Sequence, residues 1–230
     1  MKIITIIPAR GGSKSLPKKN ILSLNGKPLL CYSVEYSLRS QLVTSTVVST
    51  DSQEIADIAQ SSGASVPFIR PDEYARDDTR DYPVIRHALD FFEGQGQIFD
   101  LYILLRPTSP LRPSGLIEKA LEILEDNMDA TSVRSMASIK EHPYRVWRQN
   151  DDMSVCGFIE SELEPYNIPR QELPELLFQT GDIEVIRRET IINGSISGEY
   201  VYPLIIDHED MIDIDSQSDF DRAERSNAGR

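Results

Sequence analysis

The feature that most constrains the fold of this chain is a short apolar run, residues 3–7, that ends at Pro8 and opens into a loop with two adjacent glycines. An apolar run bounded by turn residues predicts a buried β-strand. Glycine lets backbone N–H groups turn toward an anion that a Cβ atom would block. A strand that ends in such a loop is where an α/β sheet usually receives a phosphate group. We therefore expect an anion-binding loop directly after the first strand.

Positive charge is concentrated at the same end of the chain. Residues 1–34 contain six Lys and Arg residues and no Asp or Glu, whereas the whole chain of 230 residues has 24 basic and 37 acidic residues and a formal net charge of −13. An acidic protein with one carboxylate-free end is expected to bind a local anionic ligand there. Nucleic acid is not expected as a ligand, because binding a duplex rests largely on neutralising its phosphates.

The loop differs from the two commonest nucleotide-binding motifs. It lacks the Gly-Lys-Ser/Thr of the P-loop at the required spacing, and it lacks the third glycine of the dinucleotide fingerprint. A lone Gly-Gly turn is more often a solvated turn at the start of a helix. The segregated positive charge and the position after a first strand favour phosphate binding here.

Strands and helices alternate through the first 133 residues. β-branched and apolar runs predict further strands at 43–50, 65–69, 99–105 and 130–133. Apolar residues at helical spacing predict helices at 27–39, 52–63, 83–92 and 116–124. This alternation predicts an α/β fold of three layers with a mainly parallel sheet. Ligands of such sheets bind outside the carboxyl ends of the strands. Four loops are therefore expected to gather on one rim, those at Arg10, Asp51, Arg70 and Arg106.

The alternation breaks between residues 135 and 176, an aromatic-rich stretch that contains the only Trp. We predict a single domain, residues 1–230, in which 135–176 form an inserted arm. An aromatic-rich excursion that cannot bury itself in the main core often packs on a partner subunit, and a surface flap is the alternative. The chain is expected to return with strands at 181–187 and 200–206 and a last helix from about residue 216.

Residues 211–215 alternate apolar and acidic side chains. If this segment is extended, Asp213 and Asp215 share one face, with carboxylates about 6–7 Å apart. Such a pair beside a triphosphate suits Mg²⁺. The alternative is that Asp215 or Ser216 caps the last helix, and Asp215 could serve both purposes. Farther back, Arg170 offers a planar fork for a substrate carboxylate, or is an ordinary surface arginine.

Composition also bears on the compartment. No apolar run approaches the roughly 20 residues of a membrane span, and the N-terminal run is too short for a signal peptide. The two cysteines, Cys31 and Cys156, lie far apart without neighbouring His or Cys clusters. They are expected to be free thiols in a reducing compartment. We expect a cytoplasmic protein without a membrane partner.

Four separated segments resemble the acylneuraminate cytidylyltransferases, the CMP-sialic acid synthetases. In chain order they are Pro-Ala-Arg-Gly-Gly-Ser-Lys at 8–14, Val-Ser-Thr-Asp at 48–51, Arg-Pro-Thr-Ser-Pro-Leu-Arg at 106–112 and Ile-Asp-Ile-Asp at 212–215. Pro-Arg-Gln-Glu-Leu-Pro at 169–174 also matches a family segment. The resemblance implies a Rossmann-like nucleotidyltransferase domain whose arm forms a homodimer. It further implies transfer of CMP from CTP to the anomeric hydroxyl of a nonulosonic, α-keto acid sugar, with Mg²⁺ and release of pyrophosphate, in cell-surface polysaccharide biosynthesis.

The resemblance also implies roles for individual residues. The nucleotide would be held by Arg10, Gly11, Gly12, Ser13, Lys14, Lys19 and Asn20, with Arg70 near the base. The metal would be held by Asp213 and Asp215, and these two with Arg10, Lys14 and Lys19 would form the catalytic group. The acidic sugar would be held by Arg106, Ser109, Arg170 and Gln171, with Arg170 reaching across the dimer interface.

Two residues depart from the family pattern. Arg106 stands where many members carry Gln at a position expected to face the sugar, and Asp182 stands where sialic acid enzymes usually carry a small or apolar residue. A fixed positive charge at position 106 is expected to alter substrate choice, toward another anionic group. Legionaminic acid, pseudaminic acid, a deaminated nonulosonate or another acidic sugar therefore stay open as acceptors. Two other functions also stay open, a nucleotidyltransferase for a sugar 1-phosphate and an inactive nucleotide-binding regulatory protein. The sequence identifies no general base.

Overall fold

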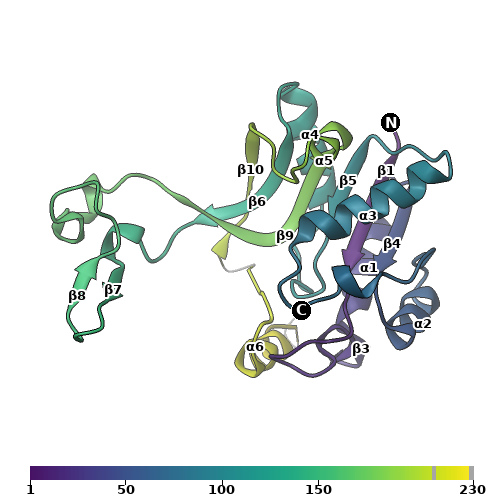
Figure 1. The fold of residues 1–230 in the computed structure, drawn as a ribbon, viewed down its shortest axis with the longest axis horizontal. Coiled ribbons are helices and arrows are strands. Elements are labelled where there is room, and N and C mark those ends of the chain that lie inside the picture. Colours follow the sequence, from purple (N-terminus) through teal and green to yellow (C-terminus); the bar gives the residue numbers. More distant parts are fainter. Residues whose placement is uncertain (209–210, 228–230) are drawn as a thin grey trace.

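A six-stranded mixed sheet organises the structure, a computed structural model that describes residues 1–208 and 211–227 (Figure 1). The strand order is β10-β6-β9-β5-β1-β4. In sequence order these strands are β1 (Ile3–Pro8), β4 (Ser45–Ser49), β5 (Leu101–Leu104), β6 (Ser132–Ser138), β9 (Leu177–Arg187) and β10 (Val201–Ile205). β1 runs parallel to β4 and β5, and β10 runs parallel to β6, whereas β9 is antiparallel to both of its neighbours. The predicted, mainly parallel sheet is confirmed.

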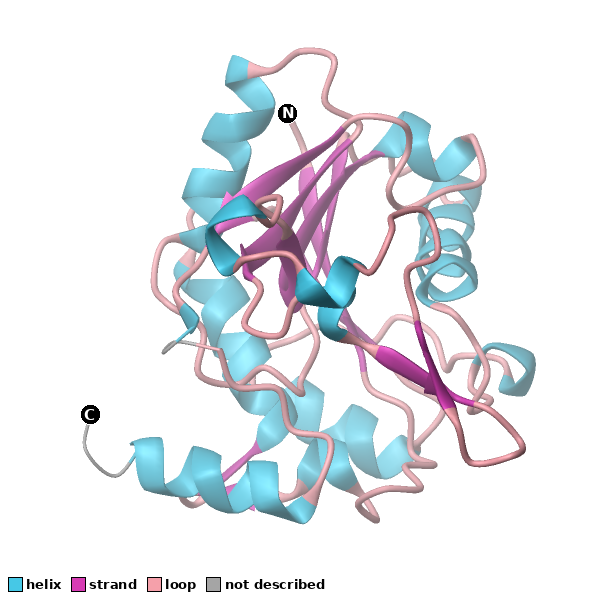
Figure 2. Ribbon diagram, turned by 90° about the vertical axis from the view of Figure 1, so that its left-hand side faces the viewer, coloured by secondary structure: helices cyan, strands magenta, loops and turns pink. Residues whose placement is uncertain are grey.

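Helices cover both faces of the sheet, which gives the three predicted layers (Figure 2). They are α1 (Leu29–Arg39), α2 (Gln53–Ser61), α3 (Asp81–Gly94), α4 (Leu116–Asp126), α5 (Arg188–Ile192) and α6 (Gln217–Asn227). β1 shows how one strand serves two cores. Ile3 and Ile7 pack with apolar residues of α1, α2 and α4, while Ile4 and Ile6 pack with those of α3 and α5. A strand buried on both faces is the expected centre of a parallel sheet.

A third apolar cluster fastens the end of the chain to its beginning. Leu16 from the loop after β1 packs with Ile212, Ile214 and α6 residues, beside a small hairpin of β2 (Ser23–Leu24) and β3 (Lys27–Pro28). A 3₁₀ helix, η1 (Lys19–Ile21), lies between the loop and this hairpin. Because Ile212 and Ile214 are buried in this cluster, the side chains of Asp213 and Asp215 face the solvent.

One predicted strand, at 65–69, does not form. Residues 65–69 contribute only an isolated bridge, Val47 to Ser65, because Pro67 interrupts the run and has no N–H to donate to a ladder. Residues 211–215 keep the predicted alternation of buried Ile and exposed Asp but form no ladder. The N–H of Ile214 instead donates to the Thr108 carbonyl at 2.8 Å, so this segment is anchored to the loop after β5.

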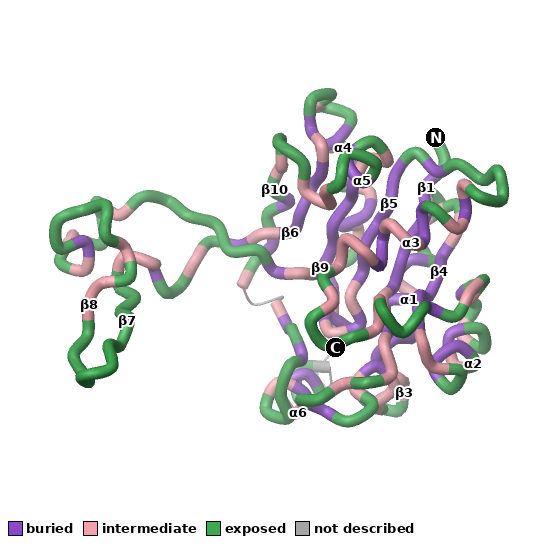
Figure 3. The backbone as a smooth tube through the Cα atoms, in the orientation of Figure 1, coloured by how far each residue is buried: buried purple, intermediate pink, exposed green. Residues whose placement is uncertain are grey.

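The arm, residues 139–176, projects from the sheet between β6 and β9 (Figures 1 and 3). Its boundary lies later than the predicted 135, because β6 continues to Ser138. It contains an antiparallel pair, β7 (Trp147–Gln149) and β8 (Val155–Gly157), and three 3₁₀ helices, η3 (Pro143–Arg145), η4 (Pro165–Asn167) and η5 (Arg170–Glu172). The Trp147 ring packs on the Tyr166 ring with centroids 4.1 Å apart. Most of the arm is exposed, in contrast to the sheet.

β9 carries a bulge that matters for the site. Its pairing with β6 shifts between Arg134 and Met136, so that four residues of β9, 180–183, stand opposite Ser135. Gly181 takes a positive φ of 83° there. The Ser135 hydroxyl stabilises the bulge, because it accepts from Ile183 N–H at 3.1 Å and lies 2.9 Å from the Thr180 hydroxyl. Bulges of this kind redirect side chains next to functional sites. Within the described ranges, no helix is long and apolar enough to cross a membrane.

Candidate functional site

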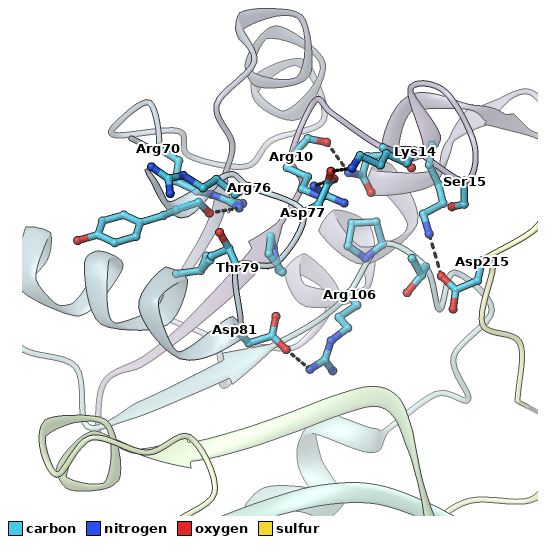
Figure 4. A pocket seen from close by; sticks show the side chains of 18 residues that line it. Arg10, Lys14, Ser15, Arg70, Arg76, Asp77, Thr79, Asp81, Arg106 and Asp215 are labelled. Atoms are coloured by element: carbon cyan, nitrogen blue, oxygen red, sulfur yellow. Dashed lines mark hydrogen bonds and ion pairs between the residues drawn. The ribbon is translucent and has the colours of Figure 1, made fainter. Parts of the chain in front are cut away.

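A cavity of about 430 Å³ opens at the carboxyl ends of β1 and β5 (Figure 4). The loops that contain Arg10, Arg70 and Arg106 all line it, and Asp51 supports the first of them, so the predicted gathering of four loops is confirmed. Eight residues predicted for the site line the cavity: Arg10, Ser13, Lys14, Lys19, Asn20, Arg70, Arg106 and Asp215. The other predicted residues, Gly11, Gly12, Ser109, Arg170, Gln171 and Asp213, are not among the residues that line it.

The glycine loop is shaped by contacts with the start of α2. The Gly11 N–H donates to Asp51 Oδ1 at 2.8 Å, and a Cβ atom on Gly11 would lie 3.1 Å from the Ser52 Cβ atom. Gly11 thus allows a close approach, whereas Gly12 faces open space. The Asn20 side chain donates to the Arg10 carbonyl at 2.9 Å and fixes the other side of the loop. Sequence reasoning placed Asp51 on the rim but did not find this supporting role.

Arg10 and Lys14 enclose a carboxylate at one end of the cavity. Both form ion pairs with Asp77, which belongs to the polar segment between the 3₁₀ helix η2 (Asp72–Tyr74) and α3. Hydrogen bonds from Lys14 and Arg10 hold the pKa of Asp77 below its ordinary value. The two cations therefore already bind an anionic group of the protein itself. Asp77 was not predicted as a site residue, because nothing in the sequence links it to a loop more than sixty positions earlier.

Lys19 joins the first loop to residues near the C-terminal helix. Its Nζ atom donates to the Ile214 carbonyl at 3.0 Å and to Asp215 Oδ1 at 2.9 Å. The Lys19 side chain is largely buried while the Asp215 carboxylate is mostly exposed and lines the cavity. Asp213 is also exposed, and its charge acts on the buried pair Arg112 and Asp182.

Arg70 is buried and supports the wall of the cavity. Its Nε–H donates to the Ser49 hydroxyl at 3.0 Å, a terminal N–H donates to the Ser49 carbonyl, and another donates to the Tyr74 carbonyl at 3.3 Å. Burial lowers the pKa of Arg70 to about 10, still well above neutrality, so the group stays charged. Arg70 thus ties the end of β4 to η2 and lines the cavity.

Arg106 lies apart from the Arg10 and Lys14 group, beside Asp81 (Figure 4). Its Nη2 atom donates to Asp81 Oδ2 at 2.6 Å and to Glu184 Oε1 at 2.6 Å. Burial lowers the pKa of Arg106, but the Glu184 and Asp81 charges together raise it above the ordinary value. The expected unbalanced positive charge at position 106 is therefore not present, because two carboxylates neutralise it.

Arg112 is buried and holds the loop after β5 against its neighbours. Its Nε–H donates to the Asp182 carbonyl at 2.5 Å, and its Nη1 atom donates to the Ser33 hydroxyl at 2.9 Å. Burial raises the pKa of Asp182, which does not line the cavity. The second departure from the family pattern, Asp182, therefore belongs to the support of the β9 bulge.

Several predicted residues lie away from the cavity. Ser109 is buried, and Thr108 lines the cavity beside it. Arg170 and Gln171 are exposed on η5, in the arm. Two residues that sequence reasoning missed, Asp81 and Glu184, meet Arg106, and no local pattern marks them, since their partner lies 25 and 78 positions away.

The chain is similar to several known proteins. Residues 4–211 match the cytidylyltransferase family. The chain is 34% identical over 223 residues to an N-acylneuraminate cytidylyltransferase of Escherichia coli, covering 96% of this chain and 51% of that protein. It is 36% identical over 228 residues to a CMP-N,N'-diacetyllegionaminic acid synthase of Legionella pneumophila, covering 98% and 96%. It is 34% identical over 182 residues to a pseudaminic acid cytidylyltransferase of Campylobacter jejuni, covering 79% and 76%. The chain thus spans about half the length of the E. coli relative.

The fold is also similar to solved structures. A CMP:2-keto-3-deoxy-manno-octonic acid synthetase complexed with CTP superposes with a TM-score of 0.73 and 19% identity, covering 100% of this chain and 99% of that one. A 4-diphosphocytidyl-2C-methyl-D-erythritol synthase from Anaerococcus prevotii has a TM-score of 0.62 and 16% identity, with the same coverage. At these identities the likeness establishes the shared fold alone.

Proposed function

The chain belongs to the cytidylyltransferase family, and we propose that it transfers CMP from CTP to the anomeric hydroxyl of a nonulosonic, α-keto acid sugar and releases pyrophosphate. The observation that carries this proposal is a cavity with two chemically different ends. One end is lined by Arg10, Lys14 and Lys19 and suits a triphosphate. The other end is lined by the paired Arg106 and Asp81 and suits a polyhydroxylated acceptor.

The acceptor class is supported by the relatives. Those from E. coli, L. pneumophila and C. jejuni are named for N-acylneuraminate, N,N'-diacetyllegionaminic acid and pseudaminic acid, respectively. A sugar 1-phosphate would need a free cation at the acceptor end. Arg106 is already paired with two carboxylates and supplies no free cation for a phosphate or for a carboxylate, so the preference for a keto-acid sugar rests on the relatives.

We assign the nucleotide to the loop after β1. Arg10 and Lys14 would bind the β- and γ-phosphates in the position where they now bind the Asp77 carboxylate. Ser13 and Asn20 line the same wall, the backbone of Gly11 and Gly12 would approach the phosphates, and Arg70 would lie near the base. A carboxylate bound by these two cations supports the assignment, because it stands in chemically for a phosphate oxygen.

Asp213 and Asp215 would hold a divalent cation, and their carboxylate oxygens fit Mg²⁺. No group of three or more His, Cys, Asp or Glu side chains that could hold a metal occurs within residues 1–208 and 211–227. Phosphate oxygens of CTP would therefore have to complete the coordination, as is usual for Mg²⁺. Burial of Ile212 and Ile214 leaves both carboxylates on the exposed side of the segment, and Lys19 orients Asp215. When bound, the cation would draw negative charge from the α-phosphate.

The residues of this chain would act mainly by positioning and charge stabilisation. The anomeric hydroxyl gives its proton to water as its oxygen attacks the α-phosphorus, the bond from that phosphorus to the bridging oxygen breaks, and pyrophosphate leaves. Arg10 and Lys14 would stabilise the negative charge that grows on the leaving pyrophosphate. Lys19 is suited to hold the α-phosphate close to Asp215, since it lies between the first loop and residues 211–215. Alignment of acceptor and nucleotide in one cavity supplies much of the remaining rate enhancement.

We further propose that the arm pairs with a second copy of the chain. Large apolar side chains are exposed along it and at the start of β9, including Trp147, Phe158 and Phe178. An exposed apolar surface of this kind typically marks a protein interface. Arg170 lies on the arm outside the cavity of its own chain, so it would bind the acceptor carboxylate in the cavity of the partner.

Pyrophosphate release tests the proposed reaction. Purified protein with Mg²⁺ and each of CTP, UTP, ATP and GTP is assayed with N-acetylneuraminic, diacetyllegionaminic and pseudaminic acids, 2-keto-3-deoxy-manno-octonic acid and a set of sugar 1-phosphates. We expect release with CTP and a keto-acid sugar. Release only with a sugar 1-phosphate, or preference for another nucleotide, would overturn the proposed acceptor or donor. CTP binding without release by any acceptor would favour a regulatory protein.

The metal assignment has its own test. Asp215→Asn is expected to lower turnover by at least about 100-fold, because it weakens cation binding and the Lys19 contact, while CTP affinity changes by only a few-fold. Asp126→Asn, the same substitution at an exposed position of α4, serves as the control. Unchanged turnover in Asp215→Asn would contradict the assignment.

A further inference from the structure

We propose that Asp81 binds the acceptor sugar by accepting a hydrogen bond from an uncharged O–H or N–H group of the sugar. Arg106 then acts as the positioning residue that holds this carboxylate, and it does not receive the carboxylate of the sugar. This inference rests on the proposed function and names the chemistry of the acceptor end of the cavity.

The first observation is a buried ionic network behind Arg106. Glu184 is only 1% exposed and lies between two arginines, with Oε1 at 2.6 Å from Arg106 Nη2 and Oε2 at 2.8 Å from Arg134 Nη2. The second contact is an ion pair without hydrogen-bond geometry. Gln179 adds a weak bond to Oε1 at 3.3 Å. A buried carboxylate left without such partners would be strongly destabilised, so Glu184 fixes Arg106 in place.

The second observation is the charge of this network. Arg106 and Arg134 contribute two positive charges, and Glu184 and Asp81 contribute two negative charges, so the formal sum is zero. No cation of the network is left over for a further anion. Five other cations line the cavity: Arg10, Lys14 and Lys19 are paired with Asp77 or Asp215, and Arg70 and Arg76 flank η2. None of these five forms an ion pair with Asp81 among the residues that the structure describes. An anionic substituent at this end would therefore meet Asp81 without a compensating charge.

The third observation is the state of Asp81 itself. It is the first residue of α3, its side chain is 36% exposed, and it lines the cavity. Its Oδ2 atom accepts from Arg106, whereas Oδ1 accepts no hydrogen bond from the residues that the structure describes. A carboxylate with one oxygen fixed and one oxygen free is a preorganised hydrogen-bond acceptor. The group that fits it is a donor, either a hydroxyl or an amide N–H.

This geometry has a consequence for selectivity. A sugar with a hydroxyl or acylamino group at this end would be accepted, because each carries a donor. An analogue that lacks the donor would leave the Asp81 oxygen unpaired in a partly closed site, which is the situation that gives strong discrimination between substrates. An added phosphate or carboxylate would be rejected by charge. The Arg106–Asp81 pair thus presents no net charge to the acceptor.

The variant Asp81→Asn separates this proposal from its alternative by the sign of the effect. If Asp81 accepts a hydrogen bond from the sugar, the acceptor KM rises by about 10- to 100-fold, because the bond loses its charged partner. If Arg106 receives the sugar carboxylate instead, the same variant removes a competing anion and the acceptor KM falls. The CTP KM is expected to stay within about twofold, since Asp81 lies apart from Arg10 and Lys14. Asp78→Asn, at an exposed position of the loop before α3, is the control.

A double-mutant cycle tests the positioning role of Arg106. Arg106→Gln should raise the acceptor KM by itself, and the double variant Asp81→Asn with Arg106→Gln should be little worse than either single variant, because both disrupt one interaction. Unchanged melting temperature separates this effect from unfolding. Additive effects, an unchanged or lowered acceptor KM, or equal effects on both substrates would overturn the inference alone. Absence of CTP-dependent turnover of any keto-acid sugar by the unsubstituted protein would overturn the proposed function and this inference together.

Discussion

At the scale of single residues, most of the cations that line the cavity were predictable, whereas several of the carboxylates that pair with them were not. Arg10, Lys14 and Lys19 were found because residue type, glycine context and position after the first strand all point to one chemistry. Asp77 and Glu184 were missed because an ion pair between residues 67 or 78 positions apart leaves no local pattern. Arg106 shows why this matters for substrate choice. The sequence predicted its positive charge, but it did not predict the two carboxylates that neutralise that charge.

Asp77 carries the first prediction. Its carboxylate occupies Arg10 and Lys14 in the absence of CTP, so the triphosphate must displace it. Asp77→Asn is therefore expected to lower the CTP KM by about two- to fivefold, a size typical of exposed ion pairs. Initial rates at varied CTP concentration and saturating acceptor measure this, with Asp78→Asn as the matched control.

The sign of the change at Asp77 is decisive. A raised CTP KM would show that this carboxylate helps to bind the nucleotide and does not compete with it. The pKa of Asp77 is lowered by Lys14 and Arg10. The competing charge is thus present at and above the ordinary carboxylate pKa, and it is lost only when pH falls through the lowered value. We expect the advantage of Asp77→Asn to persist across neutral pH.

At the scale of elements, apolar periodicity predicted the strands and helices whose side chains are buried. It did not predict the features that depend on how strands pair. The strands β1 and β5 and the helices α1 to α4 were found from apolar patterns, because the two cores require them. For residues 211–215, the sequence predicted that an extended segment would place both aspartates on one face, and the structure shows this alternation in the burial of the side chains. The segment has no ladder because its N–H at Ile214 bonds the loop after β5. The bulge of β9 was likewise invisible, since it is defined only by its pairing with β6.

The bulge of β9 carries the second prediction. Ser135→Ala removes the hydroxyl that accepts from Ile183 N–H and leaves this buried donor unpaired. The expected loss in the free energy of unfolding is about 1–3 kcal/mol, as for a buried polar group without its partner. Denaturant unfolding measures this loss. Ser138→Ala, at the exposed end of β6, is the control and should be nearly neutral. A change below about 0.5 kcal/mol would show that another group supports the bulge.

The same variant links the bulge to the acceptor. Glu184 follows the bulge directly, and it holds Arg106, which holds Asp81. A relaxed bulge should therefore raise the acceptor KM and leave the CTP KM nearly unchanged. If instead the CTP KM rises alone, the bulge would support the nucleotide end of the cavity, contrary to this chain of contacts.

At the scale of the whole molecule, the inserted arm was predicted from a break in periodicity, and the role that we propose for it requires a contact between subunits. A mixture of two variants tests that role. Arg170→Ala keeps its cavity and loses the arm residue, while Asp215→Asn loses its cavity and keeps the arm. If Arg170 serves the partner's cavity, a mixed dimer has one intact site, made from the cavity of the first variant and the arm of the second. Random pairing in a twofold dimer then restores about a quarter of full activity, although each variant alone is nearly inactive.

If Arg170 serves its own cavity, or the protein is a monomer, mixing restores no activity. Sedimentation of the unsubstituted protein separates these two explanations. A dimer means that Arg170 serves its own cavity, and a monomer means that no subunit contact exists.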